Sequence, residues 1–294
     1  MIADGATQGV VLAALIVLAL GYAVVFAMTR IAATAEGARK IWPILNAEAM
    51  IVGVVLVIFF FAPVLMGPAF VLFTMRIVWE AATIRFRPVP GSQPVVWAIG
   101  AAALLLVLFI FPWQVAVMLL ALGWLGAMAW RIMSPKEPAA DLLVFPVLPT
   151  LGFAIACTGG NEALFLAAWI GIETFDSYAL LAGKVFGKRK AFPKLSPNKT
   201  IEGLAGGAIM LVLTALVAAA LLSAVSVWQA IGFALLIGVF TVTGDLSASR
   251  MKRAMGVKDY PKLVAHQGGL FDIFDSWIAT GGALAVVLAS AAMW

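Results

Sequence analysis

The residues best suited to chemistry lie mainly in one polar segment, 244–276, between two strongly apolar stretches. Asp245, Asp272 and Asp275 flank this segment, close to the ends of the apolar stretches. Ionisable groups are costly at membrane depth and usually mark a functional site. Carboxylates beside several Lys and Arg are what a protein needs to hold a divalent metal ion and a polyphosphate together. The segment therefore indicates metal-dependent phosphate chemistry.

The spacing of these residues places them on shared helix faces. If the helix before the segment continues past Asp245, then Asp245, Ser249 and Lys252 stand at i, i+4 and i+7 on one face. Asp272 and Asp275 stand at i and i+3 in the first turns of the next helix. The two helix ends are joined by a short loop, so we expect the carboxylates to converge.

A glycine pair and several cations complete this segment. Gly268-Gly269 directly precedes the last helix, so its backbone is expected to approach a ligand closely and to expose N–H groups. Four cations are candidates for neutralising phosphates, namely Lys252, Arg253, Lys258 and Lys262. The alternative is that the cations are solvated residues near a membrane surface and the acids are helix N-terminal charges. That alternative is weak for Asp245 and Asp272, which adjoin long apolar runs.

A second polar segment, 171–207, adds further candidates. Glu173 and Asp176 lie at i and i+3 near the end of a predicted helix. The stretch from Ser196 to Thr200 is predicted to form a turn, which offers hydroxyls and the Lys199 ammonium to phosphate before the next helix. Glu202 follows this turn. Taken alone, the motif is weak evidence for a phosphate site.

The composition indicates an all-α polytopic membrane protein. The chain has 294 residues, of which 64% are hydrophobic and 11% are charged, and its mean hydropathy is +1.09. No soluble domain has this composition, and no nucleic-acid partner is expected. The formal net charge of +5 is compatible with an anionic substrate or lipid. Cys157 is the single cysteine, which excludes an intrachain disulfide, and we expect it to be buried.

Hydropathy predicts a bundle of about ten (nine to ten) transmembrane helices, with the site at their cytoplasmic ends. The first apolar run, Val10 to Met28, is long enough to span and is interpreted as a helix rather than a cleaved signal peptide. The expected spans are 8–28, 48–63, 66–83, 95–111, 114–131, 142–158, 162–182, 204–222, 226–247 and 270–291.

The second and third spans are either a tight hairpin or one kinked helix, because prolines interrupt the run near Pro63 and Pro68. With ten helices all basic clusters fall on one side, so the positive-inside rule favours the hairpin, with both chain ends outside. Arg76 and Glu80, at i and i+4 in the third span, are expected to form an internal ion pair. Glycine-rich stretches at 203–207 and 281–282 are expected to mark close helix packing.

Together, these segments resemble the CDP-diacylglycerol synthases, also called phosphatidate cytidylyltransferases. The resemblance covers about 120 residues at the C-terminal end, and its specificity lies in the combination of motifs. The matching stretches are Asp176 to Ala179, Ser196 to Gly203, Gly244-Asp245-Leu246, Ser249 to Arg253, Lys258-Asp259, Gly268-Gly269, Asp272 and Asp275. Three positions depart from the family signature: its Pro, His and Arg fall on Ala265, Gln267 and Ile273. These departures bear on the lipid acceptor and the rate.

The resemblance implies transfer of CMP from CTP to phosphatidic acid, giving CDP-diacylglycerol and pyrophosphate. It implies Mg²⁺ held by Asp245, Asp272 and Asp275, with K⁺ as a candidate second ion. Ser249 and Lys252 join these carboxylates as expected catalytic residues. The expected substrate-binding residues are Asp176, Ser196, Lys199, Thr200, Glu202, Arg253, Lys258, Asp259, Gln267, Gly268 and Gly269.

We divide the chain into N-terminal transmembrane helices (1–140) and a C-terminal catalytic transmembrane region (141–294) with cytoplasmic loops 183–203 and 248–268. The expected location is the bacterial inner membrane, with the site facing the cytoplasm and a homodimer left open. Two alternatives remain: a related CTP-dependent enzyme with another lipid acceptor, and a non-catalytic homologue or transporter. Transport would favour inverted repeats and ionisable residues at mid-membrane, and neither pattern is visible.

Overall fold

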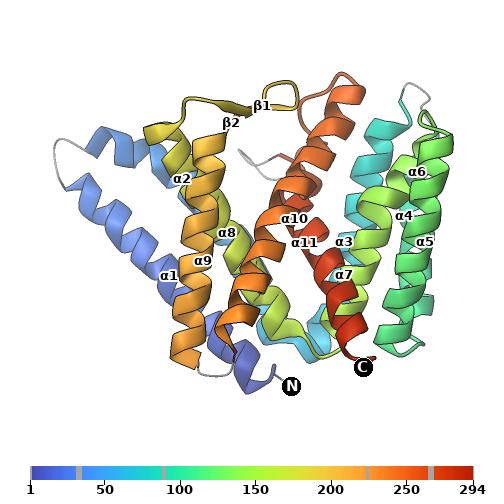
Figure 1. Ribbon diagram of the computed structural model, residues 1–294, viewed down its shortest axis with the longest axis horizontal. Helices are drawn as coiled ribbons and strands as arrows, with labels where there is room; N and C mark the ends of the chain where they lie inside the picture. The colour runs from blue at the N-terminus through green and yellow to red at the C-terminus, as the bar shows by residue number, and fades with distance from the viewer. Residues whose placement is uncertain (1, 31–34, 88–90, 223–224, 264–267, 294) are drawn as a thin grey trace.

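The computed structural model describes residues 2–30, 35–87, 91–222, 225–263 and 268–293, apart from the side chains of residues 17, 20, 24, 28, 35–41, 43, 44, 221 and 222. Most of these residues are helical (Figure 1). The helices are α1 (Gly5–Thr29), α2 (Ala35–Phe60), α3 (Ala62–Arg85), α4 (Gln93–Leu108), α5 (Trp113–Met133), α6 (Pro138–Leu142), η1 (Leu143–Val147), α7 (Leu148–Thr158), α8 (Glu162–Phe186), α9 (Ile201–Leu222), α10 (Val227–Ala254) and α11 (Leu270–Ala291). Strands β1 (Lys190–Phe192) and β2 (Ser196–Thr200) form an antiparallel hairpin between α8 and α9.

The all-α polytopic architecture predicted from hydropathy is confirmed. Within the described residues, eight helical segments are long and apolar enough to cross a membrane. Two shorter apolar helical stretches, Leu45–Phe60 in α2 and Gln93–Leu108, coincide with the remaining two predicted spans. The chain is therefore an integral membrane protein whose apolar segments follow the predicted order.

The region around Pro63 is a helical hairpin, as the charge pattern indicated. α2 ends at Phe60 and α3 begins at Ala62, so Pro63 lies in the first turn of α3. Proline is tolerated there because the first N–H groups of a helix have no partner within the helix. Figure 1 shows α2 running towards the end of the molecule that carries both termini, and α3 running back.

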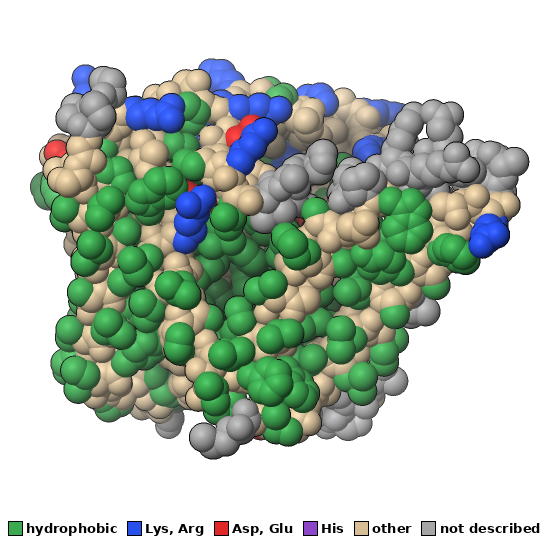
Figure 2. Space-filling view, turned by 180° about the vertical axis from the view of Figure 1, so that it is seen from behind, with side chains coloured by type: hydrophobic (Ala, Val, Ile, Leu, Met, Phe, Trp, Pro, Cys, Tyr) green, Lys and Arg blue, Asp and Glu red, His purple; other side chains and the backbone are tan. Residues whose placement is uncertain are grey.

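Arginines from three helices meet at a single carboxylate. Asp141 in α6 pairs with Arg85 of α3 at 3.0 Å, with Arg131 of α5 at 2.5 Å and with Arg250 of α10 at 3.1 Å. Because these arginines contact one side chain, the three helix ends lie at the same end of the bundle. Figure 2 shows Lys and Arg gathered at this end, above a hydrophobic surface, and Figure 1 places both termini at the opposite end.

The predicted span at 142–158 is broken rather than regular. It consists of α6, η1 and α7, and Phe145 has φ −159° and ψ 125°, which is extended backbone. Trp124 of α5 donates its indole N–H to the Val144 carbonyl at 2.9 Å. This bond gives the Val144 carbonyl, next to the break, a hydrogen-bond partner. A backbone group within the bundle that would otherwise be unpaired is therefore satisfied.

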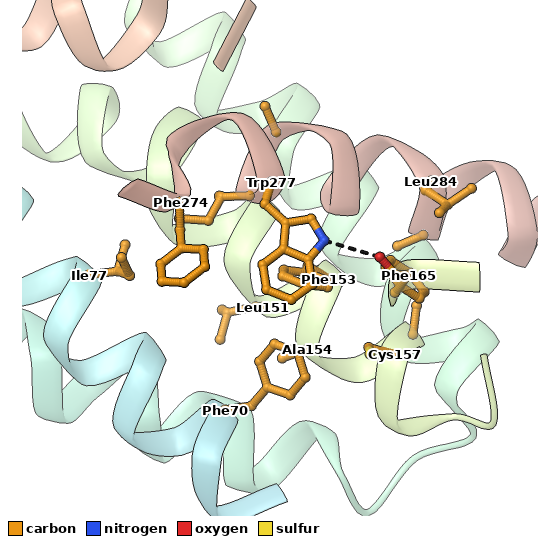
Figure 3. Close-up of a cluster of buried hydrophobic side chains, with 14 of the residues drawn as sticks. Phe70, Ile77, Leu151, Phe153, Ala154, Cys157, Phe165, Phe274, Trp277 and Leu284 are labelled. Atoms are coloured by element: carbon orange, nitrogen blue, oxygen red, sulfur yellow. Dashed lines mark hydrogen bonds between the residues drawn. The ribbon is translucent and has the colours of Figure 1, made fainter. Parts of the chain in front are cut away.

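The core is built around α11, whose aromatic side chains pack against α3, α7 and α8 (Figure 3). The Trp277 ring centroid lies 4.9 Å from that of Phe153, and its indole N–H donates to the Phe165 carbonyl at 3.2 Å. Cys157 lies in the same cluster and is fully buried, as expected from the sequence. This packing fixes α11, which carries two of the predicted carboxylates.

Close helix packing at glycines, predicted from the sequence, is confirmed. A Cβ on Gly207 of α9 would lie 2.7 Å from the Phe175 carbonyl oxygen of α8, and one on Gly281 of α11 would lie 2.5 Å from the Phe153 ring of α7. Gly244 of α10 behaves in the same way, because a Cβ there would lie 2.5 Å from the Asp275 carbonyl oxygen. These seams bring α8, α9, α10 and α11 close together.

Candidate active site

A cavity of about 690 Å³ lies at the end of the bundle that carries the β1–β2 hairpin. Its walls come from α8, α9, α10, α11 and the hairpin itself. Seven of the predicted site residues line it, namely Asp176, Ser196, Lys199, Thr200, Asp245, Asp272 and Asp275. The two polar segments, separated by 36 residues in the sequence, therefore form one site.

The hairpin side of the cavity is held in place by Glu202 and Thr200. The Glu202 carboxylate accepts the backbone N–H groups of Lys188 at 3.0 Å and Arg189 at 3.1 Å, and pairs with the Arg189 side chain at 3.0 Å. The Thr200 hydroxyl accepts the Gly203 N–H at 3.1 Å, which caps the start of α9. The segment 196–200, predicted to be a turn, is the strand β2, because it pairs with β1.

Lys199 is the electrostatic centre of the cavity. Its ammonium nitrogen lies 2.8 Å from Asp245 Oδ2 and 4.0 Å from Asp176 Oδ1. Burial acts to lower the pKa of Lys199, but the carboxylates of Asp245, Asp176 and Asp275 outweigh it and raise this pKa above its ordinary value. Lys199 is therefore a stable cation surrounded by three carboxylates.

Asp245 and Asp275 line the same cavity, next to the close contact between α10 and α11 at Gly244. Asp245 accepts a hydrogen bond from the Ser249 hydroxyl at 3.4 Å, so these two residues share one face of α10, as their spacing predicted. Asp275 is buried and accepts from the Ser276 hydroxyl at 3.2 Å. Ser249 itself is buried and does not line the cavity, so its contact with the site runs through Asp245.

Asp272 lines the cavity but is already bound by protein groups. Its Oδ1 lies 2.5 Å from the Lys252 ammonium, and its Oδ2 accepts the backbone N–H groups of Tyr260 at 2.9 Å and Gly269 at 3.0 Å. Lys252 is buried in this pair and does not line the cavity. The structure therefore places Lys252 next to Asp272 rather than in the space open to a triphosphate.

The glycine pair at the start of α11 has a conformational explanation. Gly268 has φ +95°, a region that favours glycine, and a Cβ there would lie 2.8 Å from Asp272 Oδ2. The Gly269 N–H, which we expected to be exposed to a ligand, donates to Asp272 instead. Neither glycine is among the residues that line the cavity.

Several predicted substrate-binding residues lie away from the cavity lining. Arg253 is exposed and donates to the Val257 carbonyl at 3.1 Å, and Lys258 and Asp259 are exposed on the following loop. Glu202 binds the residues just before β1 and so holds the hairpin in place, as described above. Gln267, with its neighbours Ala265 and His266, lies outside the described residues, whereas Ile273 forms part of the cavity wall.

The cavity also contains polar residues to which the sequence assigned no catalytic, metal-binding or substrate-binding role. Glu173, Lys184, Lys190 and Asn198 line it. Glu173 stands three residues before Asp176, so helical spacing was the available signal. Lys190 carried no comparable signal, because its place depends on the pairing of β1 with β2.

The acidic residues offer oxygen donors but no preassembled metal cage. In the part of the chain that the structure describes, no group of three or more His, Cys, Asp or Glu side chains is arranged to hold a metal ion. The ammonium of Lys199 lies between two of the carboxylates instead. Mg²⁺ binds few protein carboxylates and completes its shell with water and substrate phosphates. The donor chemistry of Asp245 and Asp275 therefore fits Mg²⁺ that arrives with a polyphosphate.

Comparison with known proteins gives a consistent result. A sequence model of the cytidylyltransferase family matches residues 44–291. The chain is 42% identical over 142 residues to uncharacterized protein YnbB of Escherichia coli (strain K12), which covers 48% of this chain and 45% of that protein. It is 32% identical over 207 residues to phosphatidate cytidylyltransferase of Staphylococcus aureus (strain COL), which covers 66% of this chain and 77% of that protein. The alignments thus span about half of YnbB and about three quarters of the Staphylococcus aureus enzyme.

Proposed function

This chain belongs to the cytidylyltransferase family, and we propose that it transfers CMP from CTP to phosphatidic acid, giving CDP-diacylglycerol and pyrophosphate. One observation supports this most strongly: Asp176, Asp245 and Asp275 surround Lys199 in a cavity at the polar end of an apolar bundle. A nucleotide and a lipid phosphate can meet only where polar groups adjoin the membrane. The cavity has this location.

The reaction needs charge neutralisation rather than a protein nucleophile. An oxygen of the lipid phosphate attacks the α-phosphorus of CTP, a P–O bond forms, and the bond to the bridging oxygen of the β-phosphate breaks. Pyrophosphate leaves with that electron pair. Both reactants are anions, so positioned cations lower the barrier. Among the residues that the structure describes, the cations lining the cavity are Lys199, Lys184 and Lys190.

We propose that Asp245 and Asp275 hold Mg²⁺ together with phosphate oxygens of CTP, with Asp272 beside them. A bound Mg²⁺ would neutralise charge that develops on the phosphates. Asp272 contributes mainly through its position, because both its oxygens already accept bonds from protein groups. Lys199 holds Asp245 in place until the nucleotide phosphates arrive. K⁺ remains a proposal for a second ion.

The lipid is proposed to enter from the side of the bundle. Ile172, Leu180 and Leu204 give the cavity an apolar wall, and Leu180 is nevertheless 61% exposed. The wall therefore continues to the outer face of α8, where acyl chains would lie. The lysines and arginines at this end favour a cytoplasmic orientation in a bacterial inner membrane. A homodimer also remains a proposal, for which the mass of the particle in detergent is the test.

The first experiment is turnover of labelled CTP by purified protein in detergent, with phosphatidic acid and Mg²⁺. We expect release of pyrophosphate and a CDP-lipid that depends on the metal and stops with EDTA. Absence of product from folded protein would contradict the proposal. A panel of other lipid acids then tests the one alternative with a structural basis, since Ile273 lines the cavity where the family signature has Arg.

A further inference from the structure

The ion pair predicted between Arg76 and Glu80 is present, but its contacts extend beyond α3. Glu80 is fully buried, and Arg76 Nε lies 2.6 Å from its Oε1. The same carboxylate accepts the backbone N–H of Leu270 at 3.0 Å and that of Phe271 at 2.8 Å. These are the first two residues of α11. A side chain from α3 thus binds the N-terminus of the helix that carries Asp272 and Asp275.

Two further observations show how closely Glu80 and Arg76 approach the chain at the start of α11. A Cβ on Gly269 would lie 2.5 Å from Glu80 Oε2, so glycine is required where the carboxylate meets the chain. Arg76 Nη2 donates to the Pro261 carbonyl at 3.3 Å, and its guanidinium lies 4.7 Å from the Trp79 ring centroid. Arg76 therefore holds both Glu80 and the polypeptide that precedes α11.

Two carboxylates share the backbone donors at the start of α11. Asp272 accepts the N–H of Gly269, and Glu80 accepts those of Leu270 and Phe271. The first N–H groups of a helix have no partner within the helix, and buried ones must be paired. Because these bonds are directional, they fix both the rotation and the axial position of α11. Asp275 lies one turn later, where it lines the cavity with Asp245.

We propose that Glu80, oriented by Arg76, is a positioning residue for the transfer reaction. It sets the register of α11, so that the carboxylates of α11 line the cavity together with Asp245 of α10. The expected effect on turnover rests on the proposed function. The role of Glu80 in positioning α11 rests on the contacts alone. A purely structural ion pair would stabilise the bundle without affecting the reacting groups.

Glu80→Gln is the main variant. Its amide keeps one acceptor oxygen and loses the charge, so one of the two α11 N–H groups loses its partner. A displacement of about 1 Å at reacting groups costs about 100-fold in rate. We expect kcat to fall by about 10- to 100-fold, with KM for CTP within about threefold of wild type and a higher Mg²⁺ concentration for half-maximal activity. Arg76→Lys should retain more activity than Arg76→Ala.

Asp141→Asn is the matched control. Asp141 is also a nearly buried carboxylate bound by arginine, and its ion-pair partners lie on α3, α5 and α10 rather than on α11. All variants are assayed well below their melting temperatures. If Asp141→Asn loses as much thermal stability as Glu80→Gln but keeps the wild-type Mg²⁺ dependence, positioning is supported. Equal losses of kcat in the two variants would overturn it.

Hydrogen exchange separates this inference from the proposed function. In Glu80→Gln, the amides in the first turn of α11 should exchange faster than in wild type, whichever substrate the enzyme uses. Unchanged exchange there would overturn the positioning role. Faster exchange in a protein whose wild type makes no CDP-lipid would contradict the proposed function and leave the geometric role standing. The Arg76 variants provide the same readout if Glu80→Gln does not fold.

Discussion

At the scale of single residues, the carboxylates that line the cavity differ in how firmly the protein holds them. Asp245 contacts Lys199 and Ser249, and part of its side chain is exposed to the cavity. Asp272 is held by the Lys252 ammonium and by two backbone N–H groups. A metal ion and its nucleotide can replace the contacts of Asp245 more readily than those of Asp272. The two residues should therefore respond differently to the same substitution.

Asp245→Asn should reduce turnover by at least about 100-fold while the protein stays folded, because groups that neutralise transition-state charge are worth this much. Asp272→Asn should lose activity and also stability, by about 3 kcal/mol, because it leaves the buried Lys252 ammonium without a counter-charge. Turnover and thermal melts of both variants check the contrast. Asp4→Asn, at the opposite end of the bundle, is the control. Asp245→Asn with wild-type turnover would remove Asp245 from the site.

The charge state of Lys199 gives a pH prediction. Its pKa is raised above the ordinary value of 10.5, so the stabilisation from its ion pairs is fully present below that value. It is lost only as pH rises through the folded-state pKa. The melting temperature difference between wild type and Lys199→Met should therefore not fall as pH rises from about pH 7.5 to about pH 9.5. Thermal melts in that range test this, and a difference that shrinks towards the upper end contradicts it.

Spacing placed Asp272 and Asp275 on one face of a helix, and the family resemblance added Asp176 and Lys199 to the same predicted site; Asp176, Lys199, Asp245 and Asp275 line one cavity. Spacing and resemblance did not predict that Lys252 pairs with Asp272, nor that Glu80 binds the start of α11. The partners in these contacts are 20 and 190 residues apart in sequence. Such pairings depend on how the helices pack, and neither hydropathy nor periodicity contains that information.

At the scale of helices and strands, glycine seams decide how closely the carboxylates approach one another. Gly244 allows α10 to contact the backbone of α11 at Asp275, one residue before Asp245. The close contact between α8 and α9 likewise sets how closely Asp176 of α8 approaches the hairpin. Helix contacts in membranes depend on such small residues, because lipid offers the same apolar environment as a neighbouring helix. The electrostatics of the cavity therefore depend on residues that carry no charge.

Gly244→Ala tests this dependence. The added Cβ would lie 2.5 Å from the Asp275 carbonyl oxygen, so α10 and α11 must separate. We expect a loss of about 1–3 kcal/mol in stability and a clear fall in turnover. Gly232→Ala is a matched control on the same helix, since nothing lies within 4 Å of the position that its methyl group would take. If the two variants behave alike in thermal melts and turnover assays, the α10–α11 seam does not set the site geometry.

The cores of the helices were predictable, whereas several ends were not. Hydropathy placed a span at 226–247, but α10 continues to Ala254, because Arg250 pairs with Asp141 and Lys252 with Asp272. Helical spacing had indicated this extension through Asp245 and Ser249. The β1–β2 hairpin was missed, because strand pairing is a non-local property of a short polar segment.

At the scale of the whole molecule, charge and chain topology agree. The cavity, the hairpin and the Asp141 cluster lie at one end of the bundle, and both termini lie at the other (Figure 1). A chain whose ends share one side crosses the membrane an even number of times. Because Lys and Arg are usually retained on the cytoplasmic side, we propose that the cavity faces the cytoplasm, within reach of soluble CTP, and that the termini are external.

Cysteine labelling in intact cells tests that orientation. Cys157 is fully buried, so Cys157→Ala should provide a background with no reactive thiol and little change in fold. In this background, Lys194→Cys lies in the hairpin and Ala292→Cys near the C-terminus. A membrane-impermeant maleimide should label the second in intact cells and the first only after the membrane is opened. Labelling of Lys194→Cys from outside would reverse the orientation and place the cavity out of reach of cytoplasmic nucleotide.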